Sequence, residues 1–149
     1  MLVLSANLPK LMYLPRRLSD IFGEGHLGAS RGSRPHLGVD FITVPGTPIY
    51  APFDFKTQGI SFPYVGNFVL SGYKGITSEG YDIRIWYVTP LPSLLVGSID
   101  VNKGDLIGYA QSLQDKYPNI TNHIHVQVWS NTYVPNAFEY QGKYYLDYV

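Results

Sequence analysis

Two histidines stand two positions apart in the stretch TNHIHVQVWS, residues 121–130. The apolar, β-branched residues around them predict an extended strand. Side chains alternate along a strand, so His123 and His125 would share one face, about 6.5 Å apart along the backbone. Both imidazoles could then reach one small volume above the sheet. Such a pair suits metal binding or proton transfer, and the alternative is two surface histidines on an exposed sheet face.

A second cluster lies in RPHLGVDF, residues 34–41, which contains His36 and Asp40. In a helix, a spacing of four would bring these two side chains together, but Pro35 and Gly38 oppose a helix. In a flat strand they would lie about 13 Å apart, which is too far to share one ion. We therefore expect His36 to come from a loop and Asp40 from a strand, with the chain curling at Gly38.

Together the two clusters offer a metal site. His36 and Asp40, joined by one histidine of the 123/125 pair, supply two imidazoles and one carboxylate. That set is typical of catalytic zinc, with a fourth position open for water. The chain contains no cysteine, so any metal would be held by histidine and carboxylate. The fourth histidine, His26, lies in a glycine-rich loop and is expected to be exposed to solvent, with a role at the rim of a groove as the alternative.

Short strands and turns are expected to position these residues. The chain has 15 glycines, 11 prolines and 13 tyrosines, and runs such as YDIRIWYV alternate with a period of two. This pattern predicts a mainly β fold with little helix, built as an antiparallel sheet or sandwich. Tyr81, Tyr87 and Tyr109 are expected to be structural, packing on half-buried sheet faces, and contact of one of them with substrate is the alternative. The 149 residues are expected to form a single domain.

Charge and the N-terminal segment exclude some functions. The formal net charge is zero, and no cluster of Lys and Arg marks a nucleic-acid surface. The stretch MLVLSANLPKLMYLPRRLSD has no basic segment before its apolar part, and Pro9 and Lys10 interrupt it. We therefore expect neither a signal peptide nor a membrane span.

Several segments, in order, resemble the lysostaphin-type (LytM-type) zinc endopeptidases. HLGVDF…PGTPIYAPFDFKTQG is similar to their H-x-x-x-D segment and the GTPVYA strand that follows, and NHIHVQVW is similar to their H-x-H motif, PHLHFEV. VGSIDVNKGDLIGYAQS is similar to VGQxVKKGQxIGxxG, and the flanking IFGEGHLG and NTYVPNAFEY also have counterparts. The likeness covers residues 22–140 as a core. It implies one peptidase-like domain, 1–149, with residues 1–21 as an N-terminal extension.

The resemblance implies a function and a site. His36, Asp40 and His125 would hold one zinc ion, and His123 would be the catalytic histidine that contacts the zinc-bound water. The fold would form a substrate groove on antiparallel sheet. The activity would be a zinc-dependent endopeptidase that cleaves peptide bonds in bacterial peptidoglycan, in the stem or the cross-bridge.

One element of the family pattern is missing. The family has a further catalytic histidine in Y-x-H-L, and counting back from Gly97 places it at Val88, or at Thr89 with one inserted residue. Neither side chain is a base near pH 7, so a slow or impaired enzyme is expected. The alternatives are a zinc-bearing cell-wall-binding or structural phage tail module without turnover, and a structural protein whose histidines are incidental.

A route to the cell wall is also expected. Without an export signal, the protein would be carried in a bacteriophage virion, at its tail, or released by lysis to act extracellularly at the wall. Its partners would then be peptidoglycan peptide and phage tail proteins.

Overall fold

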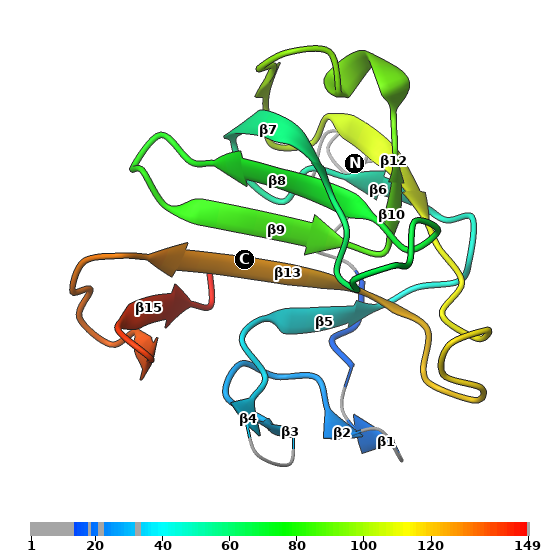
Figure 1. Ribbon diagram of the computed structural model, residues 1–149, viewed down its shortest axis with the longest axis horizontal. Coiled ribbons are helices and arrows are strands. Elements are labelled where there is room, and N and C mark those ends of the chain that lie inside the picture. The colour runs from blue at the N-terminus through cyan, green and yellow to red at the C-terminus, as the bar shows by residue number, and fades with distance from the viewer. Residues whose placement is uncertain (1–13, 18, 21–22, 32–33, 149) are drawn as a thin grey trace, which may run out of the picture.

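The computed structural model describes residues 14–148 except 18, 21, 22, 32 and 33. Their regular secondary structure is nearly all β-strand, in antiparallel sheets (Figure 1), so the predicted fold class is confirmed. In the described part no helix is long and apolar enough to cross a membrane. The elements are β1 (Ser19–Asp20), β2 (Gly23–Glu24), β3 (Ser30–Arg31), β4 (Arg34–Pro35), β5 (Val39–Ile42), β6 (Pro48–Tyr50), β7 (Phe55–Ser61), β8 (Gly72–Ile76), β9 (Asp82–Trp86), β10 (Val88–Pro90), the 3₁₀ turn η2 (Pro92–Leu94), β11 (Asp100–Val101), β12 (Leu106–Ala110), β13 (His123–Ser130), β14 (Phe138–Tyr140) and β15 (Lys143–Leu146).

The largest sheet is centred on β13. Its strand order is β11-β7-β8-β9-β13-β15-β14, and β5 pairs with the first half of β13 (Figure 1). Strand β13 alternates as its sequence predicts: Ile124, Val126 and Val128 enter the hydrophobic core. The histidine face is also buried, because the preceding loops cover it. Both faces of this strand are therefore fixed by packing.

A smaller sheet, β10-β12-β6, closes the other side of the core. Buried residues of both sheets pack into one cluster, and burial of each large aliphatic side chain contributes about 1.5–3 kcal/mol. Tyr73 is fully buried in this cluster, and its hydroxyl donates to the carbonyl of Ile107, which joins β8 to β12. The two sheets are thereby held as one unit.

The segment before the hairpins runs beside β5. The backbone N–H of Arg17 donates to the carbonyl of Asp40, and the N–H of Asp40 donates to the carbonyl of Gly25. The small hairpins β1–β2 and β3–β4 lie next to this end of the molecule, below β5 in Figure 1. Residues from the predicted N-terminal extension therefore reach the strand that carries Asp40.

The register of β13 against its two neighbours creates the site. His125 lies directly opposite Asp40 on β5 and opposite Trp86 on β9. Directly opposed residues on paired strands have Cβ atoms about 4.5–5.5 Å apart and share one face of the sheet. Strand pairing alone thus places the Asp40 carboxylate beside the His125 ring.

Candidate metal centre

Three buried side chains meet at one point. His125 Nδ1 lies 2.9 Å from Asp40 Oδ1, and His36 Nε2 lies 3.1 Å from that oxygen. The two imidazole nitrogens are 3.1 Å apart. One candidate ligand atom from each residue lies within 4.8 Å of the others. The structure therefore brings together the three residues that the sequence predicts as a metal site.

Hydrogen bonds fix which nitrogen each ring turns to the centre. His36 Nδ1 lies 2.9 Å from the carbonyl oxygen of His26, which can only accept, so the proton is on Nδ1 and Nε2 is bare. His125 has an acceptor at each nitrogen, Gln127 Oε1 at 3.0 Å from Nε2 and Asp40 Oδ1 at 2.9 Å from Nδ1; with the proton on Nε2, Nδ1 turns a lone pair to the centre. These partners set the ring orientation as the outer contacts of a metal site do.

The donor set fits zinc. Zinc–nitrogen distances of about 2.0–2.1 Å put tetrahedral ligand atoms about 3.3 Å apart, close to the 2.9–3.1 Å separations here. Two bare nitrogens and a carboxylate oxygen all present lone pairs to one volume, without a proton to share between them. Such an arrangement is unfavourable in a buried site unless a cation occupies it.

His36 and Asp40 are in the protonation states that metal binding requires. Burial lowers the pKa of His36, which keeps this ring neutral at pH 7. Burial would raise the pKa of Asp40, but its close contacts with His125 and His36 outweigh burial and hold this pKa well below its usual range. A metal requires neutral imidazole and ionised carboxylate, and neither His36 nor Asp40 must lose a proton first.

Gly38 lies against the His125 ring. A Cβ at this position would be 2.6 Å from both Cε1 and Nε2 of the ring, and 2.6 Å from the carbonyl oxygen of Val126. Glycine is therefore required here because the segment with Gly38 lies so close to β13. The sequence had instead predicted glycine for its backbone flexibility. Its φ is not among the positive values in the chain.

Gly38→Ala is expected to weaken zinc binding about 10–100-fold, because the methyl group would push His125 away from Gln127 and Asp40. Competition with a chromophoric chelator measures the affinity. Gly80→Ala is the control for a glycine replacement that affects the backbone alone. An added Cβ there meets nothing within 4 Å, although the φ of +89° makes alanine unfavourable in this turn. Equal zinc affinities of Gly38→Ala and wild type would contradict the expectation.

His123 lies beside this centre, on the same face of β13. Its Nδ1 donates to the carbonyl of Thr121 at 2.7 Å, and its Nε2 points inward, 3.4 Å from Asp40 Oδ2. Burial lowers the pKa of His123, so Nε2 is an unprotonated base at neutral pH. His26, by contrast, is exposed and contributes only its backbone carbonyl to the site.

Two solved structures with a similar arrangement of strands are of lysostaphin. The crystallised catalytic domain of lysostaphin from Staphylococcus simulans aligns with a TM-score of 0.53 and 20% identity, over 84% of this chain and 86% of that domain. The solution structure of lysostaphin also gives 0.53, at 18% identity, over 80% of this chain and 49% of that protein. The fold is therefore lysostaphin-type, as the motifs predicted.

Sequence comparison gives a different set of relatives. Leukocyte cell-derived chemotaxin-2 of Mus musculus is 34% identical over 111 residues, which are 74% of this chain and 71% of the relative. This chain belongs to the chemotaxin-2 family. The Bos taurus protein of the same name matches equally well, and Myeloid protein 1 of Gallus gallus is 33% identical over 112 residues, a third of its length. No protein-family model matches the chain.

In this chemotaxin-2 relative, Tyr87 faces the site in the segment where the endopeptidases have a second histidine. Val88 is fully buried in the core, and Thr89 hydrogen-bonds to Gln111, so neither takes the place predicted by counting from the VGSID turn. The Tyr87 ring contacts the His123 ring edge-on, with centroids 5.5 Å apart. Tyr87 packs in a buried cluster with Leu70, Leu113 and Ile120, in agreement with the structural role expected for it, and it also lines the cavity. Its φ of 72° lies at the crossing from one sheet to the other, where counting along a regular strand fails.

Three tyrosine hydroxyls form a chain that ends at Tyr87. Tyr117 donates to the Tyr64 hydroxyl at 3.0 Å, and the Tyr64 and Tyr87 hydroxyls are 2.9 Å apart. Burial raises the pKa of Tyr87 to about 12, so the phenol keeps its proton at neutral pH. Tyr87 can therefore donate a hydrogen bond in the cavity but cannot act as a base.

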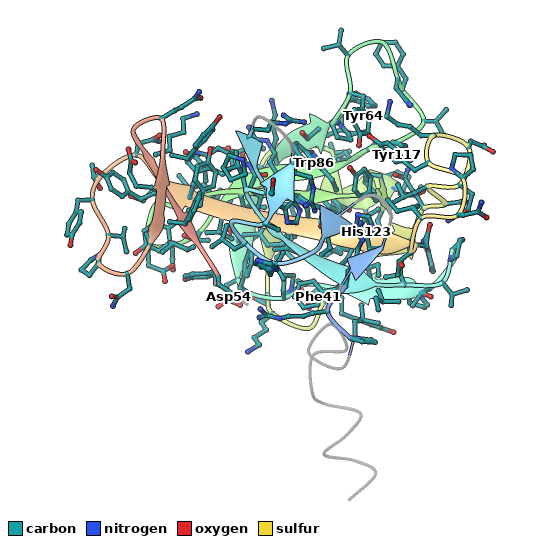
Figure 2. All side chains as sticks on the ribbon, turned by 90° about the horizontal axis from the view of Figure 1, so that it is seen from below. Phe41, Asp54, Tyr64, Trp86, Tyr117 and His123 are labelled. Atoms are coloured by element: carbon teal, nitrogen blue, oxygen red, sulfur yellow. The ribbon has the colours of Figure 1, made fainter. Side chains whose placement is uncertain are left out.

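A cavity of about 610 Å³ opens over the candidate metal centre. One wall is aromatic and apolar, and in Figure 2 Tyr64, Trp86 and Tyr117 lie on one side of His123, with Phe41 and Asp54 on the other. Trp86 stacks on the His125 ring at a centroid distance of 5.4 Å. The volume and the apolar wall are those of a site for a small molecule or a short peptide.

The sequence pattern did not predict that arginines would lie in the site. The side chain of Arg17 is 2% exposed, and its Nη1 donates to Asp40 Oδ2 at 3.0 Å, while Arg31 Nη2 lies 3.9 Å from the same oxygen. Asp40 therefore turns one oxygen to the imidazoles and the other to guanidinium groups. Arg17 is far from Asp40 in the sequence, and the residues around it gave no indication of this contact.

Proposed function

We propose that this protein binds one zinc ion through His36, Asp40 and His125, and that the zinc-bearing cavity binds peptide without efficient turnover. The observation that carries the proposal is the convergence of two imidazole nitrogens and one carboxylate oxygen in a single buried volume. Zinc, when bound, supplies a Lewis acid that polarises a carbonyl or activates water.

The residues around the centre suit a bound peptide bond. The Tyr87 hydroxyl is a hydrogen-bond donor for a carbonyl oxygen, and the Trp86 face offers apolar contact. His123 Nε2 can accept a proton from a group at the centre. Each of these side chains lines the cavity.

Efficient hydrolysis needs more than this site provides. A working peptidase of this type uses one group to accept the proton of water and another to stabilise the oxyanion. Here His123 supplies one imidazole, and the group beside it is Tyr87, a phenol whose pKa burial raises to about 12. Such a phenol is a weaker donor to an oxyanion than a protonated imidazole, and loss of an oxyanion donor altogether typically costs about 10²–10³ in rate. The names of the chemotaxin-2 relatives also describe chemotaxins, which is consistent with recognition rather than digestion.

The second candidate is a slow zinc-dependent endopeptidase acting on peptidoglycan stem or cross-bridge peptides. His123 favours it, because a neutral imidazole with its bare nitrogen aimed at the centre is what a general base requires. Action at the cell wall, and delivery by a phage tail, belong to this candidate and stay predictions.

Metal analysis and wall digestion test both candidates. Wild type is expected to carry one zinc ion per chain and His125→Ala none, with His26→Ala as a matched control that keeps its zinc because this side chain is exposed. Peptidoglycan of several chemotypes is then incubated with the three proteins, with and without chelator, and the released peptides are analysed.

The outcomes separate the candidates. A wild type without zinc under metal-replete conditions would refute both. Chelator-sensitive release of peptides by wild type and His26→Ala, but not by His125→Ala, would establish the endopeptidase. Zinc-dependent retention of peptide without release supports binding.

A further inference from the structure

The rim of the cavity carries an excess of positive charge. Its lining includes three arginines and a single carboxylate, that of Asp40. The chain as a whole has zero net charge, so this is a local concentration of cations. A bound zinc ion would add to it.

Two of these arginines face each other across a hairpin. Arg31 on β3 and Arg34 on β4 are directly opposed in the strand register. Like charges directly opposite on paired strands are destabilising. Arg31 lies 3.9 Å from Asp40 Oδ2, whereas Arg34 forms no ion pair with the described residues. An anion bound beside Arg34 would therefore also relieve the repulsion between the two guanidinium groups.

Arg34 is available for such an anion. It is exposed and lines the cavity, and its side chain has no hydrogen bond or ion pair with the described part of the chain. Its guanidinium group presents a planar fork of N–H donors that matches a carboxylate with two parallel hydrogen bonds. The aromatic wall with Tyr64 and Trp86 lines the same cavity.

We propose that the cavity selects peptides that bear a carboxylate, which pairs with Arg34 and Arg31 at the β3–β4 rim while an apolar side chain packs on the aromatic wall. This inference rests on the proposed peptide-binding function. The carboxylate can be the C-terminus of the peptide or an Asp or Glu side chain. A cavity of about 610 Å³ with one apolar wall favours a short peptide over an extended polyanion such as a sulfated glycan.

Matched peptides test this selection on the zinc-loaded full chain. The first pair is acetyl-Ala-Phe-Ala with a free C-terminus and its C-terminal amide. The second pair is acetyl-Ala-Phe-Glu-Ala-amide and the same peptide with Gln in place of Glu. Each peptide is titrated calorimetrically into wild type, Arg34→Gln and Lys74→Gln, and the zinc content of each sample is recorded.

Wild type is expected to bind the carboxylate member of at least one pair about tenfold more tightly than its neutral partner, which is the usual strength of a charge-assisted contact. The pair that shows the preference identifies the source of the carboxylate. Arg34→Gln should lose the preference and keep its affinity for the neutral peptide. Lys74→Gln, the same charge change at an exposed residue that does not line the cavity, should keep it.

Equal affinities within both pairs would overturn the inference, as would a preference that survives in Arg34→Gln. Tighter binding of a sulfated tetrasaccharide than of either carboxylate peptide would overturn it as well. A zinc-loaded protein that binds peptide without preference leaves the proposed function standing while the inference fails. A protein that binds no zinc but shows the preference would contradict the proposed function and leave the carboxylate preference standing. Binding of none of the four peptides would refute both.

Discussion

Replacing Asp40 by alanine is expected to abolish zinc binding and to lower the free energy of unfolding of the metal-free protein by about 3–5 kcal/mol, the usual effect of breaking a buried ion pair. The two side chains of the Arg17–Asp40 pair are each 2% exposed, and they are joined at 3.0 Å. Alanine removes the carboxylate and leaves the guanidinium charge buried. Urea denaturation of the chelated protein measures the loss.

His125→Ala is the matched comparison for this prediction. It also removes a proposed ligand, but it leaves the Arg17–Asp40 contact in place, so its effect on the metal-free protein should be clearly smaller. The double variant Asp40→Ala with Arg17→Met should recover part of the stability, because it replaces a buried charge that has lost the Asp40 carboxylate with an apolar side chain. Equal destabilisation by Asp40→Ala and His125→Ala would show that the buried pair contributes little.

Tyr87→His is expected to raise zinc-dependent peptide hydrolysis by about 10²–10³, since it places a second imidazole beside His123, where an oxyanion donor is otherwise weak. The backbone is compatible, because φ at this position is 72° and histidine is among the residues that tolerate positive φ. The rate of release of a chromogenic peptide, at equal zinc content, is the measurement.

Two further variants decide whether a gain in Tyr87→His reflects the chemistry. Tyr87→Phe removes the hydroxyl without adding a base and should not raise the rate. His123→Ala in the Tyr87→His background should abolish the gain, because it removes the only other imidazole beside the candidate ligands. An unchanged rate in Tyr87→His with zinc fully bound would mean that residue 87 does not limit turnover.

Asp40 links the stability of the site to its chemistry. Its Oδ1 faces the imidazoles of His36 and His125, while its Oδ2 accepts from Arg17 and lies near His123. The guanidinium contact thus leaves Oδ1 as the oxygen that would bind the proposed zinc ion. One residue thus joins the N-terminal segment, β5 and β13 at the centre of the cavity.

Much of the site followed from local sequence pattern. Alternation along β13 placed His123 and His125 on one face and Ile124, Val126 and Val128 in the core, as the structure confirms. The spacing of His36 and Asp40, together with residues that oppose a helix, required a loop followed by a strand, and this is what the chain forms. Such inferences succeed because side-chain direction in a strand is a local property.

The remaining features depend on contacts between segments far apart in the sequence. The register of β13 against β5 and β9 decided that His125, rather than His123, lies opposite Asp40. The crossing between the two sheets turned Tyr87 toward the cavity and Val88 into the core, against the count along the chain.

The sequence by itself determined the strand-rich fold and the set of residues able to hold a metal, because both follow from residue type and local periodicity. Only the tertiary structure decided which arginines surround Asp40 and which residue stands opposite His123. These contacts depend on strand register and on the packing of segments far apart in the chain. Neighbouring residues in the sequence do not determine either of them.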